Sequence, residues 1–273
     1  MNTTPPTTLT IAGSDSGGSA GLQADLRTFF ACGVHGMTAV TAVTVQNSLG
    51  VTGVHTIPPE VVAAQIESVA TDIGVAAAKT GMLATAEIIE AVAAACDRVG
   101  IGRAGKTPFV VDPVAASMHG DPLLHDTALD HYRTELFPRA TLITPNLDEI
   151  RLLTGFEVRT RAQQRDAAKM LFEYGPQWVL VKGGHLWDDP ECLDLLYDGT
   201  EFTEFIGPRF ATSHTHGSGD TLASSITASL AKGADMVSAV RAGKHFIVES
   251  VRAAYPLGAG VGPVTPLWRL PKD

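Results

Sequence analysis

Short apolar segments alternate with longer segments whose apolar residues recur at helical spacing along most of the chain. Short apolar runs bounded by Gly, Pro and polar residues are typical of buried strands, and the longer segments are typical of amphipathic helices. The predicted strands are residues 9–12, 37–45, 74–79, 107–111, 140–144 and 178–182. The predicted helices are residues 24–32, 59–72, 86–99, 123–136, 148–154, 161–174, 220–232 and 237–255. This alternation predicts an α/β fold in which helices cover both faces of a mostly parallel central sheet.

Residues 195–202 break this alternation, because two short apolar runs flank an Asp-Gly pair. Asp-Gly between strand-like runs is the sequence signal of a tight hairpin turn. We therefore expect an antiparallel hairpin at one edge of the sheet. No linker, low-complexity stretch or internal repeat divides the chain, so residues 1–273 are predicted to form a single domain. Residues 1–8, rich in Thr and Pro, are predicted to be a disordered tail.

Glycine-rich and polar segments follow most of the predicted strands. In a mostly parallel α/β sheet, ligands bind outside the carboxyl ends of the strands. Any one such loop is explained by the ordinary composition of turns. The shared character of the whole set favours a ligand site at this edge. The segments are residues 13–18, 46–47, 79–82, 112–113, 144–146 and 182–185.

Charge and cysteine content narrow the possible partners. The formal net charge of −9 argues against a nucleic-acid partner, and an anionic substrate would need local help from a helix N-terminus, a lysine or a metal ion. Cys32, Cys96 and Cys192 are scattered and have no metal-ligand spacing, which is typical of reduced thiols in a cytoplasmic protein. No apolar run is long enough to span a bilayer, and the N-terminus lacks the features of a signal peptide, so no membrane partner is expected.

A glycine turn before the helix predicted at 220–232 carries the strongest candidate chemistry. Gly217 and Gly219 allow backbone N–H groups to approach a phosphate, and the following helix adds its positive end. Asp220 in the first turn could be only a favourable helix-terminal charge. Phosphoryl transfer to a hydroxyl, however, needs a carboxylate base beside N–H donors, which is what this turn would supply. The phosphate loops of the common kinase classes are absent.

Several segments, in order and spacing, resemble the hydroxymethylpyrimidine and phosphomethylpyrimidine kinases of thiamine biosynthesis, in the ribokinase-like superfamily. The resemblance covers residues 9–232, and the segments that carry it are residues 11–18, 23–26, 41–47, 78–83, 110–114, 120–124, 144–149, 181–185 and 215–221. It implies a ribokinase-like three-layer α/β/α fold, ATP and Mg²⁺ as cofactors, a small pyrimidine substrate and a homodimer. A β-rich insertion early in the chain, typical of sugar kinases of this superfamily, is not visible.

The resemblance also implies roles for individual residues. Gln46 matches the position that hydrogen-bonds the aminopyrimidine, for which a carboxamide offers both a donor and an acceptor. Asp25 and Met82 match positions lining the same pocket, although Met82 reads almost equally well as a core residue. Gly13 belongs to a loop that brings backbone close to the ligand, and Val114 matches a position of backbone contact with the ring.

A second group of residues is assigned to the nucleotide and the metal. Asn146 and Glu149 fit the superfamily's Asn-x-x-Glu pattern near Mg²⁺, and Asp112 is a further acidic candidate; Glu149 could instead be a charge favoured by its helix terminus. Lys182, at the end of a predicted strand, matches a residue that contacts ATP phosphates and is assigned to catalysis as well. The remaining nucleotide positions are Asp198, Thr212, Gly217, Ser218 and Gly219.

Asp220 departs from much of the pyrimidine kinase branch, which has cysteine at this position. Aspartate is a conventional base for an alcohol, whereas a thiol needs a lowered pKa. The aspartate therefore favours phosphoryl transfer to an alcohol but does not identify which ring the substrate carries. A pyridoxal or pyridoxine kinase of the same fold is the alternative, and a pyrimidine-binding regulator without catalysis is a more distant one.

Overall fold

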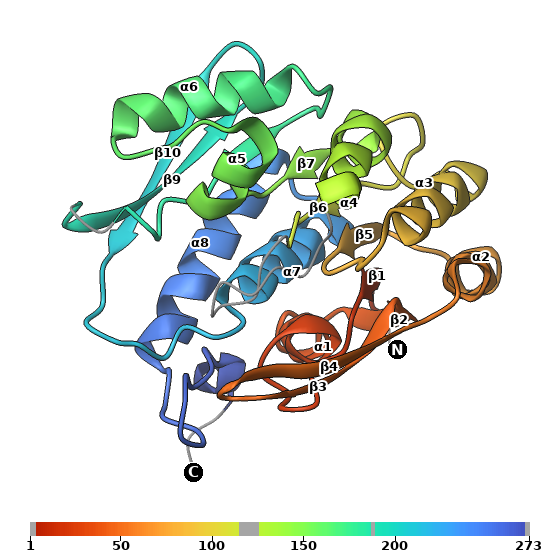
Figure 1. Cartoon of the computed structure of the whole chain (residues 1–273), viewed down its shortest axis with the longest axis horizontal. Helices are drawn as coiled ribbons and strands as arrows, with labels where there is room; N and C mark the ends of the chain where they lie inside the picture. The colour runs from red at the N-terminus through yellow and green to blue at the C-terminus, as the bar shows by residue number, and fades with distance from the viewer. Residues whose placement is uncertain (1–3, 115–125, 187–188, 271–273) are drawn as a thin grey trace.

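The computed structural model describes residues 4–114, 126–186 and 189–270. Its centre is an eight-stranded sheet with the strand order β10-β9-β8-β7-β6-β5-β1-β2 (Figure 1). Strands β8, β7, β6, β5, β1 and β2 run parallel to one another. Strands β9 and β10 add the antiparallel edge hairpin that the sequence predicted. The strands are β1 Thr7–Ala12, β2 His35–Val40, β5 Ala77–Thr80, β6 Phe109–Val111, β7 Leu142–Ile143, β8 Val179–Val181, β9 Glu191–Tyr197 and β10 Phe202–Pro208.

Alternating side chains of the central strands enter two separate hydrophobic cores, one on each face of the sheet. Phe109 and Val111 of β6 pack into one core, and Val110 between them packs into the other. Helices α2, α3, α5 and α6 contribute to the first core, and α7 and α8 to the second. The three-layer α/β/α architecture is therefore confirmed. The helices are α1 Gly21–Ala31, α2 Pro59–Asp72, α3 Ala86–Val99, α4 Asp126–His131, α5 Leu147–Thr154, α6 Arg161–Phe172, α7 Ser218–Ala231 and α8 Met236–Arg252.

The segment predicted as one strand over residues 37–45 is instead split at Thr41. The Thr41 N–H donates to the Ala12 carbonyl at 3.0 Å, and its hydroxyl donates to the Met82 carbonyl at 2.6 Å. These bonds hold Thr41 across the ends of β1 and β5, so the chain leaves the main sheet there. The next residues form β3 (Ala42–Asn47), which pairs with the unpredicted β4 (Gly50–Thr56) as a separate antiparallel ribbon (Figure 1). The expectation that no early β insertion exists is therefore wrong.

The remaining differences concern the ends of elements. β1 begins at Thr7, whose hydroxyl bonds the Gly74 carbonyl, so the expected tail over residues 1–8 is too long by at least two residues. The helix predicted at 123–136 is α4 followed by a π-helical turn at Tyr132–Leu136, and residues 115–125 lie outside the described part. Within the described ranges, no helix is both long enough and apolar enough to cross a membrane.

Candidate active site

The glycine turn at the start of α7 lies against the carboxyl ends of the parallel strands. Gly217 has a φ of 75°, and a Cβ there would lie 2.0 Å from the Ser19 carbonyl oxygen, so glycine is required. The Ser218 N–H is occupied by the Thr215 carbonyl at 3.1 Å. Within the described part of the chain, the N–H groups of Gly219 and Asp220 have no backbone acceptor. These two free donors at a helix N-terminus are suited to bind an anion.

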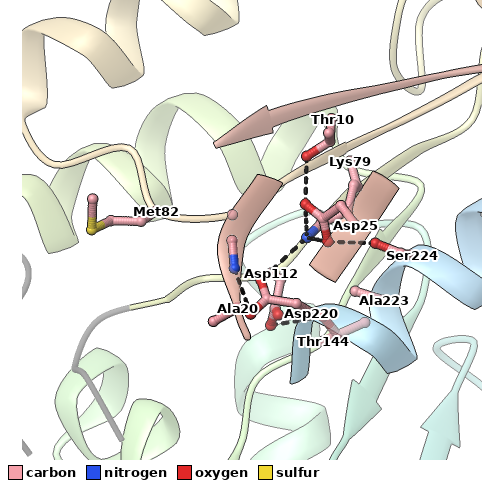
Figure 2. Close-up of polar contacts among 12 residues, drawn as sticks. Thr10, Ala20, Asp25, Lys79, Met82, Asp112, Thr144, Asp220, Ala223 and Ser224 are labelled. Atoms are coloured by element: carbon pink, nitrogen blue, oxygen red, sulfur yellow. Dashed lines mark hydrogen bonds and ion pairs between the residues drawn. The ribbon is translucent and has the colours of Figure 1, made fainter. Parts of the chain in front are cut away.

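Asp220 is held from two sides, as Figure 2 shows. Its Oδ2 accepts a hydrogen bond from the N–H of Gly21, the first residue of α1, at 3.2 Å. Its Oδ1 lies 3.6 Å from Lys79 Nζ, and the side chain is 15% exposed. The carboxylate is thus fixed in orientation and still accessible, as a base for an incoming hydroxyl must be.

Asp25 is placed beneath the site and not on its surface. Lys79 Nζ contacts both of its oxygens, at 2.8 and 2.9 Å, and both side chains are 0% exposed. Thr10 and Ser224 donate hydroxyl hydrogen bonds to the same carboxylate. The expectation that Asp25 lines the substrate pocket is corrected, because a carboxylate enclosed by four protein contacts has no face open to a ligand.

Lys79 is a charged residue of the site that the sequence assigned only to a strand-end loop. It lies in β5, where its neighbours on both sides are buried. Burial alone would lower its pKa, but the carboxylates of Asp25 and Asp220 outweigh burial and raise it above the ordinary value. A lysine inside a buried strand was the available signal, since a buried lysine must find an anionic partner.

Lys182 forms a second cluster with Asp112 and Glu149. Its Nζ lies 2.9 Å from Asp112 Oδ1 and 3.9 Å from Glu149 Oε2. Burial outweighs the opposing effect of Lys182 and, together with the negative charge of Asp112, raises the pKa of Glu149 to about 8. A Cβ on Gly219 would lie 3.4 Å from Lys182 Nζ and 3.5 Å from Asp112 Oδ2. The cluster therefore directly adjoins the glycine turn, where the predicted nucleotide residues Lys182 and Gly219 lie beside the predicted metal residues Asp112 and Glu149.

Asn146 and Glu149 also form the capping box of α5. The Asn146 side chain accepts from the Glu149 N–H at 2.9 Å, and Glu149 Oε2 accepts from the Asn146 N–H at 2.7 Å. Thr144 donates to Asp112 Oδ1. These contacts use Glu149 Oε2 and Asp112 Oδ1, which leaves Glu149 Oε1 and Asp112 Oδ2 as candidate oxygen ligands for a cation. Among the described residues there is no group of three or more His, Cys, Asp or Glu that could hold a metal ion.

Gln46 reaches the glycine turn from the β3–β4 ribbon. Its Nε2 lies 3.3 Å from His216 Nε2, and the same ring nitrogen lies 3.4 Å from Asp15 Oδ2. Asp15 in turn accepts from the N–H groups of Gly17, Ser19 and Ala20 and so orders the loop after β1. Burial opposes ionisation, but these hydrogen bonds and that of His216 lower the Asp15 pKa. His216 and Asp15 were not predicted as site residues, although both lie in segments from which the site was predicted, residues 13–18 and 215–221.

Gly13 and Met82 lie together at the ends of β1 and β5. The Gly13 N–H donates to the Met82 carbonyl at 3.1 Å, and a Cβ on Gly13 would lie 2.6 Å from Met82 Cε. Met82 is half-buried, and its contact with the substrate stays a prediction. The half-buried Val114 donates its N–H to the Asp112 carbonyl at 2.9 Å, next to the undescribed residues 115–125.

Asp198 does not belong to this site. β9 is antiparallel to β8, and Tyr197 pairs with Val179 at the amino end of β8. The turn that follows Tyr197 is therefore at the opposite edge of the sheet, where Asp198 accepts from the Thr200 and Glu201 N–H groups. The prediction that Asp198 binds nucleotide is wrong. Thr212 follows β10 at the edge where the site lies, and its nucleotide contact stays a prediction.

A fixed carboxylate, two free helix-terminal N–H groups and an adjoining lysine are the groups that a small-molecule phosphotransferase of ribokinase-like fold would use. Residues 15–265 match the sequence model of the family Phosphomethylpyrimidine kinase. The chain is 58% identical, over 98% of its length and 96% of the relative's, to the hydroxymethylpyrimidine/phosphomethylpyrimidine kinase of Mycobacterium tuberculosis. The chain therefore belongs to the phosphomethylpyrimidine kinase family.

Two further similarities place this family among related enzymes. A thiamine biosynthetic bifunctional enzyme of Arabidopsis thaliana is 45% identical over 98% of the chain, which spans 51% of that protein. The crystal structure of an ADP complex of Bacillus subtilis pyridoxal kinase superposes with a TM-score of 0.88 at 36% identity, covering 97% of this chain and 98% of that one. The pyrimidine kinase and pyridoxal kinase folds are thus closely similar.

Proposed function

We propose that the chain transfers the γ-phosphoryl group of ATP first to hydroxymethylpyrimidine and then to its monophosphate, in thiamine biosynthesis. The observation that carries the proposal is the position of Asp220. Its carboxylate is fixed by Gly21, is partly open, and adjoins the free N–H groups that begin α7. The family match supplies the substrate class.

The first step needs a base, because an alcohol is not ionised at neutral pH. Asp220 would accept the hydroxyl proton as the oxygen attacks the γ-phosphorus, and the bond from that phosphorus to the bridging oxygen of ADP would break. The N–H groups at Gly219 and Asp220 and the ammonium of Lys182 are placed to stabilise negative charge on the transferring group. Asp112 and Glu149 would hold Mg²⁺, which neutralises phosphate charge when it is bound.

The second step makes a different demand on Asp220. Its nucleophile is a phosphate monoester, which is already ionised near neutral pH because its second pKa is about 6. The same site can align this nucleophile without removing a proton. Asp220 is therefore needed as a base in the first reaction and much less in the second.

Recognition of the pyrimidine ring is assigned to Gln46. Its amide contacts His216, which immediately precedes Gly217 of the glycine turn. A pyridoxal or pyridoxine kinase differs only in this recognition, and similarity to the Bacillus subtilis pyridoxal kinase keeps it as the second candidate. A regulator that binds without catalysis is disfavoured, because Asp220, Lys182 and Glu149 all lie where catalysis would need them.

The test is a phosphorylation assay with Mg-ATP and three acceptors in parallel: the pyrimidine alcohol, its monophosphate and pyridoxal. We expect the highest kcat/KM for the two pyrimidines. A higher kcat/KM for pyridoxal would assign the chain to the second candidate. Binding of the pyrimidine without any turnover of ATP would revive the regulator.

We further propose that the chain is a cytoplasmic homodimer. Val43 and Val45 lie on one face of β3 and are 48% and 63% exposed, which gives the ribbon an apolar face that a second copy would cover. Cys32, Cys96 and Cys192 are free, in keeping with a reducing compartment. Val45→Lys should yield a monomer in analytical ultracentrifugation, whereas Val61→Lys, at an exposed position on α2, should not.

A further inference from the structure

Two helices cross at the catalytic carboxylate and support each other's acidic residue. The first residue of α1, Gly21, donates its N–H to Asp220 on α7. One turn further along α7, Ser224 donates its hydroxyl to Asp25, which lies one turn along α1. Each helix therefore binds the carboxylate of the other, and Lys79 of β5 lies between the two carboxylates (Figure 2).

The buried charges of this arrangement do not cancel. Asp25 and Lys79 would be neutral as a pair, and Asp220 adds a further carboxylate 3.6 Å from the ammonium. A fully buried ion pair is expensive to desolvate, and an apolar pair of similar volume would often serve stability as well or better. Stability alone therefore does not explain the Asp25–Lys79 pair. Its contact with Asp220, the proposed catalytic base, indicates a role in catalysis.

We propose that Asp25 and Lys79 are positioning residues that set the orientation of the Asp220 carboxylate and the charge that faces it. Lys79 draws Oδ1 toward the strand and places a positive charge 3.6 Å from it. Asp25 offsets most of the lysine's charge, so that Asp220 still accepts a proton from a hydroxyl. Both side chains are 0% exposed, so neither touches the substrate, and their effect passes through Asp220 alone. This inference rests on the proposed phosphorylation of a pyrimidine alcohol.

Other charged groups also act on Asp220 and must stay constant in a test. Lys182, after β8, interacts with Asp220, and Asp112, after β6, interacts with Lys79. Glu149 of α5 adjoins Lys182. Burial outweighs the opposing effect of Lys79 and, together with repulsion by Asp220, raises the pKa of Asp25 to about 6. Variants at Asp25 and Lys79 leave the side chains of Asp112, Glu149 and Lys182 in place.

Two variants should move the acid limb of the pH profile in opposite directions. Asp25→Asn keeps the shape of the side chain but leaves Lys79 facing Asp220 without an offset. The limb of kcat/KM for the pyrimidine alcohol should move to lower pH, and kcat should fall because the base is weaker. Asp25→Asn combined with Lys79→Met removes the cation, so the limb should move to higher pH by about one unit or more.

The monophosphate substrate is the internal control, because its phosphorylation does not need the base. Its pH profile should not differ between wild type and either variant. Shifts in the same direction, no shift in the alcohol profile, or equal loss with both substrates would overturn the inference. If Asp25→Asn does not fold, as judged by thermal denaturation, the double variant still tests the inference, because its acid limb must move to higher pH. Wild-type protein that does not phosphorylate the alcohol would contradict the proposed function instead.

Discussion

Residues of this site serve either the fold or the binding of a ligand, and the two glycines of the turn show the difference most clearly. Gly217 is required by the fold, because its positive φ and the Ser19 carbonyl exclude a side chain. Gly219 has an ordinary helical conformation, and a Cβ there would make only van der Waals contacts of 3.4 Å and 3.5 Å with Lys182 and Asp112. Its lack of a side chain serves the approach of a ligand to the N–H group.

Alanine at these two glycines should therefore have different effects. Gly219→Ala should leave the free energy of unfolding unchanged or raise it by up to about 1 kcal/mol, because alanine is the better helix former. It should lower kcat/KM for ATP by about tenfold or more, since the methyl group occupies the phosphate approach. Gly217→Ala should lose both stability and activity. Denaturant unfolding and steady-state kinetics check this, and an active Gly219→Ala variant would contradict the anion-site assignment.

Glu149 should make stability depend on pH. Its pKa is about 8 in the folded protein, against an ordinary value of 4.5, so the folded state binds more protons between these values. Stability contributed by this group is complete below the lower value and is lost as pH rises toward about 8. In Mg²⁺-free buffer, Tm should fall from about pH 5 to about pH 8.5, and Glu149→Gln should flatten this slope. Added Mg²⁺ should raise Tm more at the higher pH; an unchanged slope in the variant would exclude Glu149 as the cause.

At the scale of elements, local signals placed the helices better than the strands. The bounds of α2 and α3 agree with prediction, since Pro59 opens one helix, Thr85 caps the other and Gly100 ends it in a left-handed conformation. β4 was missed because most of its residues are at least partly exposed and it contains no apolar run. No local signal marks Thr41 as a break, because its bonds to Ala12 and Met82 join segments distant in sequence.

Two helix caps offer a matched comparison. Asn146 caps α5 within the site, and Thr160 caps α6 away from the glycine turn; each side chain accepts an N–H in the first turn. Replacing either with Ala should cost about 1 kcal/mol of stability. Only Asn146→Ala should raise the Mg²⁺ concentration needed for half-maximal activity, because it releases Glu149 from its fixed position. Equal Mg²⁺ dependence in the two variants would show that Asn146 serves only as a helix cap and does not affect Mg²⁺ binding.

At the scale of the whole molecule, sheet topology decides which predictions succeed. The rule that ligands bind at the carboxyl ends of parallel strands brought the loops of Gly13, Asp112 and Lys182 to one edge, as the structure has them. It failed for Asp198, because the sequence does not reveal which end of an antiparallel edge strand faces the site. Asp25 was misplaced because helix periodicity does not distinguish a residue beneath a site from one on its surface.

Comparing the two phosphorylation steps in an Asp220→Asn variant tests the central claim most directly. The change keeps the shape of the side chain and removes its capacity to accept a proton. We predict that kcat for the pyrimidine alcohol falls by about 10²- to 10⁴-fold, the range of a lost general base, and that kcat for the monophosphate falls far less. An equal fall in both steps, or full activity on the alcohol, would contradict the assignment of Asp220 as the base.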